Sequence, residues 1–185
     1  MTVDELRQKV DDFHTHVPRT PRAIINTRPG EKRAPGFLYS AGIHPWNSAI
    51  CTESDFKTLF VDANRREVVA IGECGIDHLR GPEIEIQQDV FVRQAEIAEK
   101  AGKPLLIHCV RAYDKILELH KRLRPQRSQW IIHGFRGKPE LARQMTRAGI
   151  YLSLGERFNP KVPESVDPRF IVRETDAMPS VDYGE

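Results

Sequence analysis

His14 and His16 are separated by one residue, at the end of the first segment that the sequence predicts to be a strand. In a strand, side chains two residues apart point to the same face, so both imidazoles can aim at one point while Thr15 faces away. Imidazole is a common protein ligand for divalent metal ions. So short a motif predicts a metal site only when further ligands join it from elsewhere in the chain.

Four further residues with ligand side chains stand at or just beyond the ends of other apolar runs, namely Glu73, His108, His133 and Asp176. Short apolar runs that end in a polar residue and a turn signal are typical of buried parallel strands. Five strand ends therefore present six ligands. Histidines combined with carboxylates suit one or two divalent ions, and we favour zinc over manganese or magnesium, since an all-oxygen set would be expected at a dedicated magnesium site.

The strands that would carry these ligands alternate with helical patterns. Strand-like runs cover residues 11–16, 23–26, 37–43, 68–73, 105–108, 130–133, 150–154 and 170–175. Helical stripes follow the capping candidates Thr52 and Ser54, cover residues 90–98 and 113–120, and run from Pro139 to Gly149. Alternating strands and helices predict an α/β fold with a parallel sheet.

Eight predicted strands indicate a TIM (β/α)8 barrel, in which catalytic residues gather at the C-terminal ends of the strands. Residues 27–36 and 159–168 are rich in proline, glycine and charge and predict loops, so helices are too few for a complete barrel. We expect a compact barrel with some outer helices missing. The chain is long enough for one core and short for two, which predicts a single domain over residues 1–185.

Composition and charge set limits on the class of protein. The net charge of +2 is too small to predict nucleic-acid binding, and it does not exclude such binding. The cysteines have no paired spacing, which favours free thiols and a reducing compartment. No apolar run is long enough to cross a bilayer, and the charged N-terminus lacks the apolar region of a signal peptide. We expect a cytoplasmic protein with no membrane partner.

Seven short motifs make the chain resemble the TatD-like metal-dependent hydrolases, also called the TatD DNase family. In order along the chain they are His14-Thr15-His16, Gly42-Ile43-His44-Pro45, Ile71-Gly72-Glu73-Cys74-Gly75-Ile76-Asp77, Ile107-His108-Cys109, His133-Gly134-Phe135-Arg136-Gly137, Tyr151-Leu152-Ser153-Leu154-Gly155 and Glu174-Thr175-Asp176-Ala177. The resemblance implies an amidohydrolase-like TIM barrel, a mono- or dinuclear metal centre and hydrolysis, usually of DNA phosphodiesters. It also implies that one ion would be held by His14, His16 and Asp176 and the other by His108 and His133, with Glu73 bridging them.

The chain departs from the family in three respects. It is shorter than usual members, because the second helix and the C-terminal helix are missing. Trp46 stands where the family commonly has a histidine, and Arg111 stands three residues after His108 rather than two. The six ligand positions are all present.

Asp176 and Glu73 are the predicted catalytic residues. A water beside a divalent cation loses its proton at a pKa near about 7, and Asp176 would orient that water and take its proton. Arg111 and Arg136 are predicted to bind phosphates through bidentate hydrogen bonds. His44 ends the third predicted strand and is predicted to contact the substrate.

The leading interpretation is a metal-dependent deoxyribonuclease or phosphodiesterase that acts on single-stranded DNA. Short loops should leave the metal site open to the end of a flexible strand, and the loop aromatics Trp46 and Phe135 are candidates for stacking on a base. The missing helices would leave outward residues such as Phe13 and Ile171 without cover, which favours a homodimer.

Two other classes stay open. A metal-activated water also attacks carbonyl groups, so an amide or ester hydrolase such as a D-aminoacyl-tRNA deacylase fits the same ligands. A non-catalytic remnant that has lost the walls of its substrate site is the third class, although a remnant gains nothing from retaining both Glu73 and Asp176. The sequence does not choose between phosphoryl and carbonyl substrates.

Overall fold

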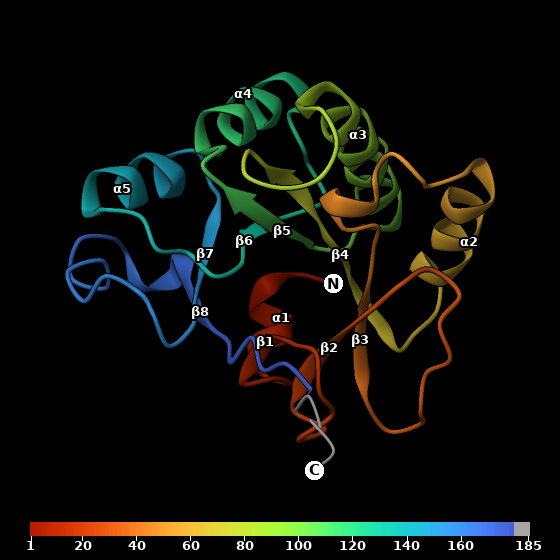
Figure 1. Cartoon of the computed structure of the whole chain (residues 1–185). Coiled ribbons are helices and arrows are strands. Elements are labelled where there is room, and N and C mark those ends of the chain that lie inside the picture. The colour runs from red at the N-terminus through yellow and green to blue at the C-terminus, as the bar shows by residue number, and fades with distance from the viewer. Residues whose placement is uncertain (180–185) are drawn as a thin grey trace, which may run out of the picture.

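Eight parallel strands follow one another in chain order around the computed structural model, which describes residues 1–179 (Figure 1). All eight lie where apolar runs predicted them, and the fourth continues four residues past Glu73. Their bounds are β1 (Asp12–Thr15), β2 (Ala23–Thr27), β3 (Leu38–Ala41), β4 (Val68–Asp77), β5 (Leu105–Val110), β6 (Trp130–Ile132), β7 (Tyr151–Leu154) and β8 (Ile171–Arg173).

Four outer helices also lie where the sequence predicted helices: α2 (Glu53–Ala63), α3 (Ile84–Ala101), α4 (Tyr113–Leu123) and α5 (Pro139–Arg147). Thr52 caps α2, since its hydroxyl accepts from the backbone N–H of Asp55, and Gly102 ends α3 in a left-handed conformation with φ of 62°. Within residues 1–179 no helix is both long and apolar enough to cross a membrane.

Three connections between strands contain no α-helix in the described chain: β1 to β2, β2 to β3, and β7 to β8. Short 3-10 turns, η1 (Pro45–Asn47) and η2 (Pro168–Phe170), follow β3 and precede β8. In Figure 1 the helices α2 to α5 form an arc outside β3 to β7, and the side formed by β1, β2 and β8 has no such cover. The prediction of a barrel with some outer helices missing is confirmed.

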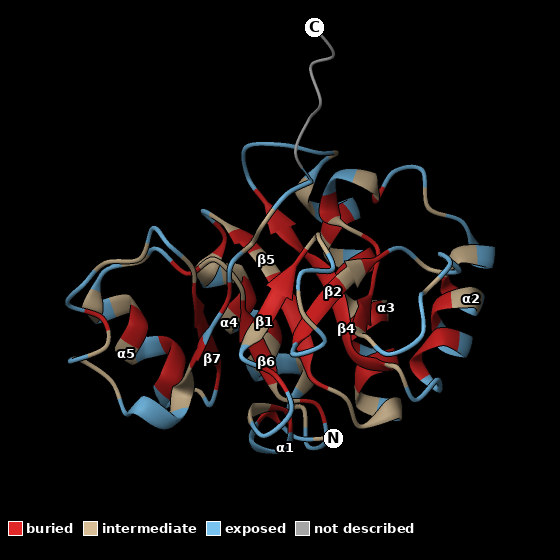
Figure 2. Ribbon diagram, turned by 90° about the horizontal axis from the view of Figure 1, so that it is seen from below, coloured by how far each residue is buried: buried red, intermediate tan, exposed pale blue. Residues whose placement is uncertain are grey.

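Two apolar clusters stabilise the barrel. The larger one lies between the strands and the outer helices and includes Cys74 and Cys109, which face away from the ligands as predicted. The second joins Val3 and Leu6 of the unpredicted helix α1 (Val3–Arg7) to strand residues such as Val69. Figure 2 shows the strands buried at the centre, with α1 below them and α2 and α5 at the sides, each exposing one face.

The expectation that Phe13 lacks cover is wrong. Phe13 is 2% exposed and belongs to the cluster that includes α1, and Ile171 is half-buried against the larger cluster. The pairing of β1 with β2 shifts register between Asp12 and Thr15, so side chains along β1 do not alternate strictly between two faces. The exposed apolar patch from which we inferred a homodimer is therefore absent at these residues.

The ring closes between β1 and β8 through a few specific hydrogen bonds. The backbone N–H of Asp176 donates to the carbonyl of His14 at 3.0 Å, and the N–H of His16 donates to the carbonyl of Ala177 at 2.9 Å. The carboxylate of Asp12 accepts from the N–H of Thr175 at 3.0 Å and from its hydroxyl at 2.6 Å. This seam places the ligands of the first and last strands side by side.

A buried ion pair joins the loop between β2 and β3 to α2. The side chains of Asp62 and Arg33 are 2% and 6% exposed, with Arg33 Nη1 2.9 Å from Asp62 Oδ1 and Arg33 Nη2 2.9 Å from Asp62 Oδ2. The same carboxylate accepts from the N–H of Gly30 and from Arg65, which is 54% exposed. Burial raises the pKa of Asp62, but these donors together hold it below its usual value.

We expect Asp62→Asn to lower the free energy of unfolding by about 3 kcal/mol at neutral pH, because it leaves the buried Arg33 without a counter-charge. Since the folded-state pKa is depressed, the carboxylate stabilises the fold above about pH 4, its unfolded pKa, and this contribution is lost as pH falls through the folded-state pKa. Urea unfolding of both proteins from pH 7 downward should show the difference narrowing in acid. Arg65→Ala, at an exposed partner, should cost less than about 1 kcal/mol; an equal cost would contradict the importance of burial.

Candidate metal centre

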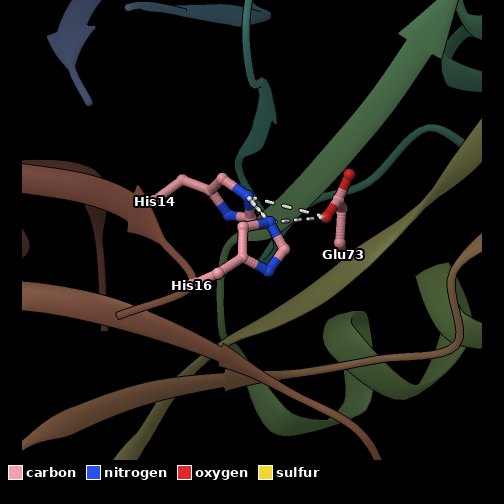
Figure 3. A group of neighbouring side chains, drawn as sticks. All are labelled: His14, His16 and Glu73. Atoms are coloured by element: carbon pink, nitrogen blue, oxygen red, sulfur yellow. Dashed lines mark hydrogen bonds and ion pairs between the residues drawn. The ribbon is translucent and has the colours of Figure 1, made fainter. Parts of the chain in front are cut away.

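The six predicted ligands meet at the C-terminal ends of the strands. His14 on β1 and His16 just after it direct their Nε2 atoms at the carboxylate of Glu73, which comes across the barrel from β4 (Figure 3). Asp176, after β8, reaches the same two imidazoles. His108 on β5 and His133 after β6 contact Glu73 from the other side.

His14, His16, Asp176 and one oxygen of Glu73 form the first group of donors. The two Nε2 atoms lie 3.3 Å apart. Their distances to Glu73 Oε2 are 3.5 and 3.8 Å, and those to Asp176 Oδ1 are 3.6 and 3.7 Å. Ligand atoms about 2.1 Å from a tetrahedral ion lie about 3.4 Å from one another. The distances among His14, His16 and Glu73 are near this length, and these three donors are close enough together to hold one divalent ion. Asp176 approaches both imidazoles from the other side.

The other oxygen of Glu73 serves a second group. Glu73 Oε1 lies 2.8 Å from His133 Nε2, 2.9 Å from His108 Nδ1 and 3.3 Å from His44 Nε2. His44, Glu73 and His108 are close enough together to hold an ion. The shorter distances are hydrogen-bond lengths, so a bound ion would have to separate these atoms slightly. Because each oxygen of Glu73 faces one group, the carboxylate has the position of a bridge.

A β-bulge positions Glu73 between the two groups. Ile71 pairs with Leu105 and Cys74 pairs with Ile107, so β4 carries one extra residue opposite β5. A Cβ atom at Gly72, which has φ of 138°, would lie 2.4 Å from a backbone oxygen of β5, so only glycine fits there. Gly72 therefore permits the close approach of β4 to β5 that directs the Glu73 carboxylate between the two groups of donors.

Burial and mutual contact shape the charges of the group. Burial and the neighbouring His133 lower the pKa of His14 well below its usual value. Burial would raise the pKa of Glu73, but His133 and hydrogen bonds from the histidines hold it well below its usual range. Burial opposes charge on His133 too, and Glu73 and Glu174 nevertheless raise its pKa. An ionised carboxylate and a neutral His14 are the forms that bind a cation.

Two carboxylates that the sequence analysis did not assign support the histidines from behind. Asp77 Oδ2 lies 3.1 Å from His108 Nε2 and accepts from the indole N–H of Trp46 at 2.7 Å. Glu174 Oε1 accepts from the N–H of Gly134 and lies 3.5 Å from His133 Nδ1. Carboxylates in such positions fix the orientation of ligand imidazoles.

We expect Asp77→Asn to weaken metal binding about 10- to 100-fold, because the amide cannot hold the His108 imidazole as the carboxylate does. Zinc affinity measured by competition with a chelator would test this. Trp46→Phe removes only the indole hydrogen bond and should have the smaller effect. Equal affinity of Asp77→Asn and the wild-type protein would mean that Asp77 does not orient His108.

The predicted substrate contacts lie in different surroundings. Arg136 is exposed and lines a cavity beside Asp176, and Arg111 is exposed after β5 with φ of 52°. Trp46 is 44% exposed, with its ring centroid 4.6 Å from that of His44. Phe135 is 1% exposed and packs edge-on against a neighbouring ring, so the prediction that it stacks on a base is wrong. Loop position alone could not distinguish the two aromatic residues.

The comparisons with known proteins identify the family of this chain. Residues 13–182 match the family model described as TatD related DNase. The chain is 33% identical over 135 residues to the uncharacterized metal-dependent hydrolase YabD of Bacillus subtilis, a match that covers 70% of this chain and 53% of YabD. It is 34% identical over 124 residues to the 3'-5' ssDNA/RNA exonuclease TatD of Erwinia billingiae, covering 66% and 48%. The chain thus spans about half the length of the curated relatives it matches.

Solved structures support the fold. The structure of YjjV, a TatD homologue from Escherichia coli, matches with a TM-score of 0.77 at 22% identity over 92% of this chain and 80% of that one. A TatD family hydrolase from Entamoeba histolytica matches with a TM-score of 0.66 at 22% identity, over 76% and 50%. At this identity the similarity establishes the barrel architecture alone.

Proposed function

Because this chain belongs to the TatD-related DNase family, we propose that it is a metal-dependent phosphodiesterase that acts on single-stranded DNA. The observation that carries the proposal is the position of Glu73, whose two oxygens face two separate groups of donors at the open end of the barrel. A paired site of this kind suits the displacement of a phosphate ester. Zinc is the ion that the mixture of histidines and carboxylates favours.

Each ligand has a part in the proposal. His14, His16, Asp176 and Glu73 would hold one ion, and Glu73, His108 and His133 the other. When bound, divalent ions lower the pKa of water and neutralise charge on a phosphoryl oxygen. The side chain of Asp176 is 36% exposed, so it can orient the attacking water and accept its proton.

We also propose that Arg111 and Arg136 bind the phosphates of the strand, while His44 and Trp46 face the substrate beside the second group. The connections that follow β1, β2 and β7 contain no α-helix, and we propose that a flexible strand end reaches the site from this side. We propose a 3′ end as the substrate, because this chain is similar to about half of a relative that is named a 3'-5' ssDNA/RNA exonuclease. The cytoplasm is the compartment we propose.

The decisive test is to assay the zinc-loaded protein side by side on linear single-stranded DNA, the same DNA as a circle, bis(p-nitrophenyl) phosphate and an aminoacyl ester. We expect loss of the linear strand from its 3′ end, turnover of the small diester and an intact circle. Equal cleavage of the circle would make the protein an endonuclease. Turnover of the aminoacyl ester alone would overturn the proposed function.

A further inference from the structure

A small polar cavity lies beside the first group of donors. Its volume is about 210 Å³, and it opens between the segments that follow β6, β7 and β8. Asp176 forms part of its wall, so the cavity and the first metal position share a residue. Two arginines, Arg136 and Arg157, also line it. Nothing in the sequence alone had singled out Arg157.

Neither arginine has an acidic partner among residues 1–179. The ion pairs of that part of the chain use other arginines, and Glu156, which also lines the cavity, forms none with either. The carboxylate of Glu174 is buried and engaged with the N–H of Gly134. Glu174 and Asp176, which also line the cavity, face the imidazoles of His133, His14 and His16 rather than the arginines. The two arginines are therefore available to an anion that enters the cavity.

Both arginines sit on segments that packing holds in place. Arg136 follows the buried Phe135, whose backbone N–H donates to the carbonyl of Ser153, and precedes Gly137, where a Cβ would lie 2.5 Å from the Phe135 ring. Arg157 precedes Phe158, over whose ring the guanidinium of Arg173 lies at 4.9 Å. Such preorganisation lowers the entropic cost of binding an anion.

We infer that Arg136 and Arg157 form a second phosphate subsite, which binds the phosphate next to the one that the metal centre would hold. This inference rests on the proposed function and makes it more specific. Guanidinium groups match the oxygens of a phosphate in a bidentate fork, and a cavity of this size admits a phosphate with part of its sugar rather than a whole nucleotide. The protein then prefers substrates with at least two phosphates.

The test uses thymidine dinucleotides that differ only in their number of phosphates. TpT has one, while pTpT and TpTp each carry a second at one end. For the wild-type protein we expect kcat/KM to be at least about tenfold higher for one of the two-phosphate dinucleotides than for TpT, which corresponds to about 1.4 kcal/mol. Whichever of pTpT and TpTp has the higher kcat/KM shows on which side of the cleaved bond the cavity lies.

Arg157→Ala and Arg136→Ala should bring this ratio close to one, and Arg157→Lys should leave an intermediate ratio because it keeps the charge but not the fork. Arg122→Ala, at an exposed arginine on α4 outside this cavity, is the control and should keep the wild-type ratio. Equal kcat/KM for all three dinucleotides, or a full ratio in Arg157→Ala, would overturn the subsite.

Failure of the proposed function is distinguishable from failure of the subsite. If bis(p-nitrophenyl) phosphate and all three dinucleotides resist cleavage, the proposed function is wrong. Calorimetric binding of the two-phosphate dinucleotides and TpT then decides the subsite: tighter binding of a two-phosphate dinucleotide, lost in Arg157→Ala, supports it, and equal affinities refute it.

Discussion

Replacing Glu73 with glutamine is expected to lower kcat/KM on bis(p-nitrophenyl) phosphate by more than about 1000-fold. Mutation of a residue that only supports a metal ligand already lowers metal affinity or activity by about 10- to 100-fold, and Glu73 contacts both groups of donors directly. The amide keeps the shape of the side chain but loses the charge that both groups of donors share. It also leaves His133 and His108 beside a neutral group where each now has a carboxylate oxygen within 2.9 Å. Metal content after reconstitution with zinc should fall together with activity.

The control for this prediction is Glu140→Gln, at an exposed carboxylate on α5 that forms an ion pair with Arg143 and lies outside the site. It should keep both its metal and its activity. Circular dichroism would separate loss of the site from loss of the fold, because the barrel core is built from apolar clusters that do not contain Glu73. A Glu73→Gln protein that keeps full metal content and full turnover would refute the bridging role.

Asp176→Asn should produce a different defect. His14, His16 and Glu73 still offer three donors in the first group, so much of the metal should stay bound. The asparagine cannot accept a proton from the attacking water, so kcat should fall about 100- to 10,000-fold, the usual contribution of a general base. Measuring kcat against bound zinc separates the two effects. Full loss of zinc with unchanged kcat per bound ion would mean that Asp176 acts only as a ligand.

The sequence predicted the barrel well because its strands are buried on both faces and appear as continuous apolar runs. The meeting of the six predicted ligand side chains could be predicted for the same reason, since they stand at or just beyond the ends of five strands. The prediction that Phe13 faces outward was wrong, because the irregular pairing of β1 with β2 disturbs the alternation of side chains that the sequence pattern assumes. Asp77 and Glu174 were missed because they act through another side chain, and that relation exists only in three dimensions.

The closure of the ring between β1 and β8 links stability to metal supply. Three of the donors, His14, His16 and Asp176, stand on the two edges that must meet, and the backbone between those edges contributes only a few hydrogen bonds. An ion held by all three would act as a cross-link between the first and last strands. Its binding would add stability in proportion to the logarithm of the free metal concentration. The thermal midpoint should therefore rise with added zinc, and amide hydrogen exchange without metal should be fastest along this edge of the barrel.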